Sequence, residues 1–305
     1  MSVDKTISIV STTSRGSSVI EESYTVVRSL GSGEFGQVKE VKKKTGGGKR
    51  FAWKQVSLEK DPYCENEVHL LGQLKHEGIV RIYDAYFRDG VVLDMVLELC
   101  PKGSMKEYIQ SNYEMFPTSY PNKVYIRPDC IDIQSAMRQV LDAVKFLHAN
   151  CVAHRDIKPG NVLLASGQRW KLADFNLSTN FQPGGYMVDH VGTRPFKAPE
   201  VPNKCYTEKC DIYSMGILFI ALVTGRNYWR PEDRPESASG DGWLMAQAEI
   251  LDEKVSWHGR EFGAKALSFA KAMMQTPESN RYSAEEALEN EWLTSVSGHS
   301  CCVIS

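Results

Sequence analysis

The order of apolar and polar positions changes character part-way along the chain. Up to Leu99, short apolar runs broken by glycine predict β-strands at 24–30, 51–56, 79–87 and 91–99. The segment 65–74 is the exception, because Val68, Leu71 and Leu74 recur at spacings of three. This spacing predicts a helix that places Glu67 beside its apolar stripe.

Beyond Leu99 the apolar positions follow a helical period. Helices are predicted at 133–149, 211–225, 264–274 and 284–293. The longest apolar run, 215–223, is well short of the roughly 20 residues that a membrane-spanning helix needs, so it predicts a buried helix. A strand-rich part followed by a helix-rich part predicts an α+β fold with two lobes, at 22–98 and 101–295. Ligand sites favour the cleft that such a hinge, near 98–103, would create.

The two ends of the chain differ in composition from this domain. Residues 1–21 are rich in Ser and Thr with little apolar periodicity, which predicts a flexible N-terminal tail, and 296–305 form a C-terminal tail. A formal net charge of -2 gives no general attraction for nucleic acid. Eight cysteines without paired metal-ligand spacings and the absence of a signal peptide predict a reducing, cytoplasmic setting.

A glycine-rich loop follows the first predicted strand. In "LGSGEFGQV" the residues Gly31, Gly33 and Gly36 form a GxGxxG pattern, which would let backbone N–H groups approach phosphate oxygens. The glycines at 46–48 rule out the helix that a dinucleotide-binding fold requires next. A β-turn-β flap over a nucleotide is therefore favoured, and a plain glycine-rich turn is the alternative.

A lysine in the next strand has a candidate partner in the helix that follows. Alternation places Ala52, Lys54 and Val56 on one face of the strand, so that a cation lies beside two small apolar residues. Glu67, beside the apolar stripe of its helix, would be costly without a partner. A Lys54–Glu67 ion pair, with Lys54 meeting phosphate, accounts for both positions.

The segment "HRDIKPGN" carries the candidate chemistry. Asp156 can accept a hydroxyl proton, Lys158 can neutralise a phosphoryl group in transfer, and Asn161 supplies an amide oxygen suited to Mg²⁺. Asp174 in "KLADFN" follows a short apolar strand and supplies the second metal ligand. Together these residues predict a phosphoryl-transfer centre.

The chain resembles the eukaryotic protein kinase superfamily through "GSGEFGQV", "FAWK", the helical Glu67, "HRDIKPGN", "DFN" and "APE" in the order and spacing of that family. The resemblance covers residues 22–295 and implies a bilobal kinase fold that uses ATP and Mg²⁺. It implies that Asp156 is the catalytic base and that Lys54 grips the nucleotide phosphates. Lys158, two residues after the base, implies transfer to Ser/Thr hydroxyls of protein substrates.

The resemblance also assigns residues around these groups. Thr193 would hydrogen-bond Asp156 and Lys158, Glu200 would pair with Arg281, and Asp211 would brace the catalytic loop. The implied ATP-binding residues are Leu30, Gly31, Ser32, Gly33, Glu34, Phe35, Gly36, Val38, Ala52, Lys54, Glu98, Cys100 and Leu163, with Glu98 and Cys100 acting through their backbone.

Two residues depart from the family pattern. Asn176 stands where the family has the glycine of "DFG". Because Asn tolerates left-handed backbone angles best among non-glycine residues, we expect an active enzyme in which strain on the order of 1 kcal/mol disfavours the flipped, inactive loop; a substitution without effect is the alternative. Asp189 stands four residues before Thr193, where many kinases carry an activating phosphothreonine. Asp189 would partly satisfy Arg155 and predicts basal activity without loop phosphorylation; an ordinary surface Asp is the alternative.

The sequence leaves three function classes and one modification open. A serine/threonine protein kinase leads, a pseudokinase scaffold supported by Asn176 is the first alternative, and a small-molecule or lipid kinase is the second. The final residues "CCVIS" fit farnesylation of Cys302, with Cys301 as a palmitoylation candidate, which predicts peripheral attachment to the cytosolic face of a membrane. An unmodified tail is the alternative.

Overall fold

The chain folds into two units that are not contiguous in sequence. The computed structural model describes residues 10–12, 19–32, 36–45, 47–61, 63–88, 90–115, 124–126, 132–224 and 262–295. The first unit comprises the described residues up to Lys102 together with Leu164–Ser178, and the second comprises Gly103–Leu163 and the described residues from Thr179 onward. The chain therefore passes between the units after residues 102, 163 and 178.

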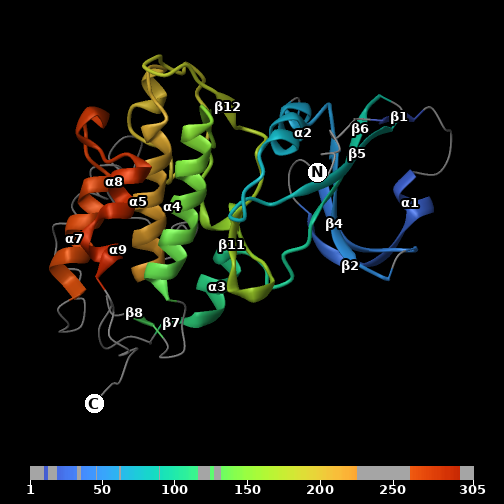
Figure 1. The fold of residues 1–305 in the computed structure, drawn as a ribbon, viewed down its shortest axis with the longest axis horizontal. Helices are drawn as coiled ribbons and strands as arrows, with labels where there is room; N and C mark the ends of the chain where they lie inside the picture. Colours follow the sequence, from blue (N-terminus) through green and yellow to red (C-terminus); the bar gives the residue numbers. More distant parts are fainter. Residues whose placement is uncertain are drawn as a thin grey trace, which may run out of the picture. The chain divides into compact units, whose positions relative to one another are not determined.

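The first unit is built around a β-sheet (Figure 1). The strand order is β1-β5-β6-β4-β3-β2, and neighbours run antiparallel except for the parallel pair β1–β5. The strands are β1 (Val10–Thr12), β2 (Tyr24–Ser32), β3 (Gly36–Lys43), β4 (Arg50–Ser57), β5 (Ile82–Arg88) and β6 (Val92–Glu98). The four strands that the sequence predicts are confirmed, and β3 completes the expected hairpin with β2.

One helix packs on this sheet and one strand returns to it from later in the chain. Helix α2 (Cys64–Gln73) contacts β5 and β6, and its buried face includes Val68 and Leu71, as the spacing predicts. Strand β11 (Trp170–Leu172) joins the unit through Leu172, whose N–H donates to Gly78 O at 2.8 Å and whose carbonyl accepts from Val80 N at 2.9 Å. These bonds fix the segment that continues into Asp174.

Part of the predicted N-terminal tail has regular structure. Within residues 1–21, strand β1 pairs with Tyr86–Arg88, and helix α1 (Val19–Ser23) begins. Ile20 is buried in a cluster with Tyr24, Phe51 and Trp53, a packing role that the Ser/Thr-rich composition of this stretch did not reveal.

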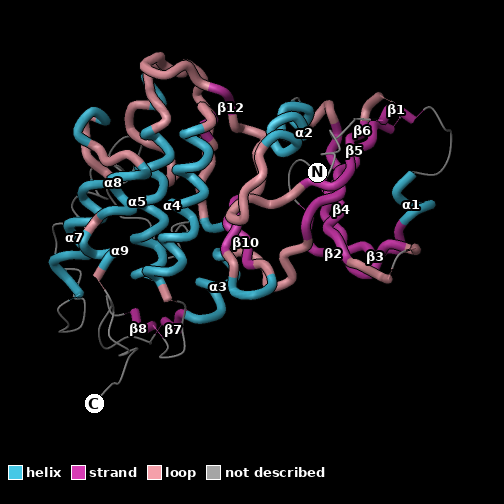
Figure 2. The backbone as a smooth tube through the Cα atoms, viewed as in Figure 1, coloured by secondary structure: helices cyan, strands magenta, loops and turns pink. Residues whose placement is uncertain are grey.

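The second unit is mainly helical, as the colours of Figure 2 show. Helix α4 packs against α5, α8 and α9, and its bounds match the sequence prediction. The helices are α3 (Met105–Asn112), α4 (Ile133–Ala149), α5 (Lys209–Thr224), α7 (Phe262–Met273), α8 (Ala284–Glu289) and α9 (Glu291–Thr294). The short strands are β7 (Tyr113–Met115), β8 (Val124–Ile126), β9 (Val152–Ala153) and β12 (Thr179–Asn180), and β10 (Val162–Leu164) lies where the chain leaves the unit.

One of the predicted helices is divided in the structure, and the apolar helix is buried as predicted. The single helix expected at 284–293 is two helices, because the side chain of Asn290 accepts from Trp292 N at 2.9 Å and starts α9. The apolar run in α5 is buried as expected, from Cys210 to Leu222. None of the helices in the described ranges combines the length and the apolar character required to cross a membrane.

Candidate active site

The glycine-rich loop is described only at its two ends. Gly31 and Ser32 end β2 and Gly36 begins β3, whereas Gly33, Glu34 and Phe35 lie outside the described residues. A Cβ added at Gly36 would lie 1.8 Å from the carbonyl oxygen of Gln55 in β4. Close strand approach therefore requires glycine at this position, independently of any phosphate.

Three of the proposed adenine-pocket residues lie in the sheet. Val38 pairs directly with Lys54, and Ala52 lies two residues before Lys54, so these side chains share one face of the sheet. Leu30 precedes Gly31, which pairs with Val38. Leu163 lies in β10 in the second unit.

The proposed hinge residues, Glu98 and Cys100, lie at the end of β6 and just beyond it. Glu98 ends β6 and donates its N–H to Arg81 O at 2.7 Å. Burial raises the pKa of the Cys100 thiol to about 12, and the nearby Glu98 adds to this shift, so the thiol stays protonated at neutral pH. Its side chain therefore supplies no charge to the site.

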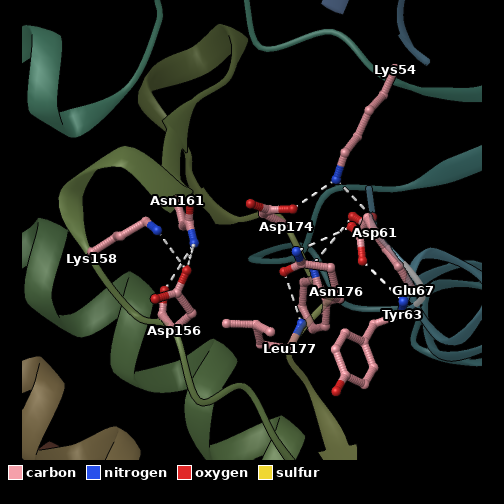
Figure 3. Close-up of polar contacts among 11 residues, drawn as sticks. Lys54, Asp61, Tyr63, Glu67, Asp156, Lys158, Asn161, Asp174, Asn176 and Leu177 are labelled. Carbon is pink, nitrogen blue, oxygen red and sulfur yellow. Dashed lines mark hydrogen bonds and ion pairs between the residues drawn. The ribbon is translucent and has the colours of Figure 1, made fainter. Parts of the chain in front are cut away.

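The first polar cluster of the site is Lys54 between two carboxylates (Figure 3). Its Nζ lies 2.7 Å from Glu67 Oε2 and 2.7 Å from Asp174 Oδ1. The ion pair that the sequence predicts between Lys54 and Glu67 is therefore present, and Asp174 joins it. Burial alone lowers the pKa of Lys54, but the two carboxylates raise it by more, so its net pKa is above the ordinary value and the ammonium stays charged.

Two further observations fix the position of Asp174 in this cluster. Phe175 N donates to the second oxygen of Glu67, Oε1, at 3.2 Å. The backbone φ of Asp174 is +64°, in the left-handed region, which costs about 1–3 kcal/mol for a non-glycine residue and persists only where neighbours enforce it. The Asp174 side chain remains one-third exposed, so this cluster does not enclose it fully.

The second polar cluster surrounds Asp156, which is buried in the second unit. Its Oδ2 accepts from Lys158 Nζ at 2.6 Å and from Asn161 Nδ2 at 3.0 Å (Figure 3). Its Oδ1 accepts from Thr193 Oγ1 at 2.7 Å and from Thr193 N at 3.0 Å. Lys158 also donates to Thr193 Oγ1 at 2.8 Å, so the contacts expected of Thr193 with both residues are present.

Asp211 holds the backbone of the loop that carries Asp156. Its carboxylate, fully buried in the first turn of α5, accepts from His154 N at 2.8 Å, Arg155 N at 2.7 Å and His148 Nε2 at 2.9 Å. Burial alone would raise the pKa of Asp211, but these hydrogen bonds, that of His148 first, lower it below the ordinary value. Arg155 has a left-handed φ of +64°, and the bond to its N–H stabilises that conformation.

A glycine and a buried ion pair hold the segment that carries Thr193. Gly192 has φ +96°, and a Cβ there would lie 2.6 Å from Arg155 O, so only glycine permits this approach to the loop that carries Asp156. The expected pair of Glu200 with the fully buried Arg281 is present in a bidentate arrangement, with Nη2–Oε2 at 3.0 Å.

Asp189 contacts Arg155 as the sequence predicts. Its Oδ2 lies 2.7 Å from Arg155 Nη1, which also donates to Tyr206 Oη at 3.1 Å. The arginine side chain is 8% exposed and the aspartate 59% exposed. Tyr206 Oη in turn donates to Asp189 O at 2.8 Å, so backbone and side chain of Asp189 are both held.

The expectation of a left-handed backbone at Asn176 is wrong. The described non-glycine residues with positive φ are Cys151, Arg155, Gln168, Asp174 and Lys204, and Asn176 is not among them. The left-handed turn falls two residues earlier, at Asp174. Asn176 therefore carries no strain of this kind, and its side chain has another role that its hydrogen bonds define.

Comparison with known proteins agrees with this arrangement. Residues 24–293 match the protein kinase domain, a stretch that contains both polar clusters. The chain belongs to the protein kinase family. It is 30% identical over 287 residues to calcium-dependent protein kinase 4 of Plasmodium berghei, covering 90% of this chain and 50% of the relative. The same-named protein of Plasmodium falciparum is also 30% identical, and that of Arabidopsis thaliana is 29% identical. This kinase-family chain spans about half the length of these curated relatives.

Each unit contains an oxygen donor of the kind that Mg²⁺ prefers, Asn161 in the second unit and Asp174 in the first. The side-chain nitrogen of Asn161 donates to Asp156 Oδ2 at 3.0 Å and to the main-chain oxygen of Asp156 at 2.9 Å, so its amide carbonyl is the oxygen that it could offer to a metal. Asp174 offers a partly exposed carboxylate. Mg²⁺ prefers hard oxygen ligands, so each of these two groups by itself is of the type that the ion prefers.

Sequence reasoning missed two residues of this kinase site. Gly192 is needed for the close approach to Arg155, and Asp61 contacts Asn176 at 3.3 Å across 115 residues of sequence. The glycine before Thr193 was a visible signal. Nothing in the local pattern around Asp61 marks its partner.

Proposed function

We propose that the protein is a serine/threonine protein kinase that transfers the γ-phosphoryl of ATP to protein hydroxyls. The observation that carries the proposal is the Asp156 carboxylate, which Lys158, Asn161 and Thr193 hold in a defined orientation. A carboxylate so placed can accept the proton of an attacking hydroxyl, and Lys158 can balance the charge of the phosphoryl group in transfer.

The other residues of the proposed reaction bind and orient the nucleotide. Lys54, kept charged between Glu67 and Asp174, is proposed to hold the α- and β-phosphates. Asn161 and Asp174 are proposed to hold Mg²⁺, which when bound would neutralise charge that develops on the phosphates. The family match across 24–293 includes all of these residues and supports their acting on one nucleotide.

A phosphotransfer assay tests this proposal. Purified protein with ATP labelled at the γ-phosphate and Mg²⁺ is expected to label Ser and Thr peptides, and a metal chelator is expected to stop the labelling. Labelling of small metabolites or lipids with no peptide acceptor would favour the small-molecule kinase instead. A pseudokinase scaffold, which the sequence supports through Asn176 in place of the family's glycine, is the other alternative, and equal labelling by the native protein and Asp156→Asn would favour it.

We expect basal activity without phosphorylation of the loop before Thr193. Asp189 already occupies Arg155, so phosphatase-treated protein should keep most of its turnover. Asp189→Ala should lower kcat about 3- to 10-fold, the effect of about 0.7–1.4 kcal/mol that one hydrogen-bonded ion pair supplies. The measurement is initial rate before and after phosphatase treatment of both proteins. Turnover that disappears from the native protein after treatment would contradict this expectation.

The proposal includes lipid attachment through the C-terminal residues. Its support is the sequence "CCVIS", in which Cys302 fits a farnesylation signal and Cys301 offers the second acylation that stable anchoring requires. Residues 296–305 lie outside the described part of the structure. Mass spectrometry of the C-terminal peptide from eukaryotic cells is expected to show farnesyl on Cys302, together with a membrane fraction that Cys302→Ser abolishes. An unmodified peptide and unchanged fractionation would remove this part of the proposal and leave a cytoplasmic location.

A further inference from the structure

Both ends of the Asn176 side chain are engaged inside the first unit. Its Nδ2 donates to Asp61 Oδ2 at 3.3 Å, and its Oδ1 accepts from Leu177 N at 2.8 Å (Figure 3). Asn176 is 4% exposed and Asp61 is 1% exposed. The family's glycine at this position has no side chain and could not make either contact.

Asp61 connects this contact to the start of helix α2. Its other oxygen, Oδ1, accepts from Tyr63 N at 3.0 Å, immediately before the helix begins at Cys64. Tyr63 stands at the N-cap position and its side chain makes no capping hydrogen bond, whereas the Asp61 side chain satisfies its backbone N–H. One carboxylate thus holds the helix start and the Asn176 amide.

Helix α2 carries Glu67, which belongs to the Lys54 cluster. The segment after Asp174 is tied to the same helix by Phe175 N to Glu67 Oε1 at 3.2 Å and by Asn66 Nδ2 to Ser178 O at 2.7 Å. The contact at Asn176 is a third connection, and it lies between these two along the segment. Of these three connections, the contact between Asn176 and Asp61 is the one that depends on the side chain at position 176.

We propose that Asn176 is a positioning residue, which through Asp61 keeps Asp174 and Glu67 in the relative placement that holds Lys54. This inference rests on the proposed kinase function. Because two other connections remain, and because 3.3 Å is long for a hydrogen bond, we expect a moderate effect. Removing it should lower kcat/KM for Mg·ATP by about 5- to 15-fold, at the lower limit of what a hydrogen bond to a charged group contributes.

An exchange of the two side chains gives a direct test. In the double variant Asp61→Asn/Asn176→Asp, the amide at position 61 can still accept from Tyr63 N and can donate to a carboxylate at position 176. That carboxylate can still accept from Leu177 N, so the number of hydrogen bonds and the net charge are conserved. Asn176→Asp alone places two buried carboxylates together, and Asn176→Gly removes the contact.

The expected result is a loss in the single variants that the exchange reverses. Asn176→Asp and Asn176→Gly should each lower kcat/KM for Mg·ATP by about 5- to 15-fold with the KM of the peptide unchanged, and the double variant should return to within about 3-fold of the native value. Glu59→Gln, an exposed carboxylate two residues before Asp61, is the matched control and should have no effect.

Hydrogen exchange in the nucleotide-free protein provides a readout besides activity. The amides of Tyr63 and Leu177, which donate to Asp61 and Asn176, should exchange about 5- to 15-fold faster in Asn176→Asp and recover in the exchange variant. Two results would overturn this proposal without affecting the proposed function. One is an Asn176→Gly variant with native kcat/KM and native amide exchange rates. The other is a double variant whose kcat/KM is no higher than that of Asn176→Asp. A native protein without Asp156-dependent turnover would overturn the proposed function, while the exchange rates would still decide whether the contact holds these two segments.

Discussion

Replacing Asp156 with asparagine is expected to lower the rate of phosphoryl transfer by at least about 10²-fold, because the group that would accept the hydroxyl proton is lost. In the native protein Lys158 and Asn161 both donate to Asp156 Oδ2. The amide nitrogen of an asparagine at position 156 could not accept these two hydrogen bonds. Single-turnover measurement with labelled ATP isolates this step from product release. Nucleotide affinity should change little, since Lys54 and Asp174 are proposed to bind the phosphates and metal.

The control for this variant is Asp142→Asn on the exposed face of α4 in the same unit. It removes the same charge from the protein and should keep native turnover. If Asp156→Asn and native protein gave the same background signal, the pseudokinase scaffold would replace the enzyme as the best account of this chain.

Replacing Glu67 with glutamine is expected to have the second-largest effect. The side chain is 1% exposed and pairs with Lys54, and breaking a buried ion pair typically costs about 3–5 kcal/mol. Because Asp174 stays in contact with Lys54, we expect the Glu67→Gln variant to lose about 3 kcal/mol of unfolding free energy, the lower end of this range. We also expect kcat/KM for Mg·ATP to fall by about 10²-fold as Lys54 loses its orientation.

The matched control lies two residues away on the same helix. Glu65 is exposed in the first turn of α2, and Glu65→Gln should change the unfolding free energy by less than about 0.5 kcal/mol. Urea unfolding and ATP kinetics on both variants make the comparison. Equal behaviour of the two variants would contradict the role given to the Lys54–Glu67 pair.

Strong periodicity explains which elements were predictable. The bounds of α4 follow from its apolar spacing, and the strands β2, β4, β5 and β6 follow from short runs between glycines. Local patterns could not reveal β1, which is defined by pairing with β5, a strand some seventy residues later. They also missed the division between α8 and α9, because the Asn290 cap lies inside a continuous apolar pattern.

The site was predictable where a residue's chemistry required a partner of opposite charge. A cation on a half-buried strand and a carboxylate on an apolar helix face implied the Lys54–Glu67 contact. The contact of Asp189 with Arg155 followed instead from the resemblance to protein kinases. The role of Asn176 was not predictable in this way. Its neutral amide binds Asp61 through tertiary folding across 115 residues, and backbone preference alone suggested the wrong conformation.

The return of residues 164–178 to the first unit limits how the molecule can be divided. A fragment that stopped at Lys102 would lack Leu172, leaving the N–H of Val80 and the carbonyl of Gly78 without the partners they have in the whole chain. It would also lack Asp174 and Asn176, so both Lys54 and Asp61 would lose a contact. Split-protein reporters or isolated-lobe studies must therefore supply this fifteen-residue stretch in trans or graft it onto the amino-terminal piece.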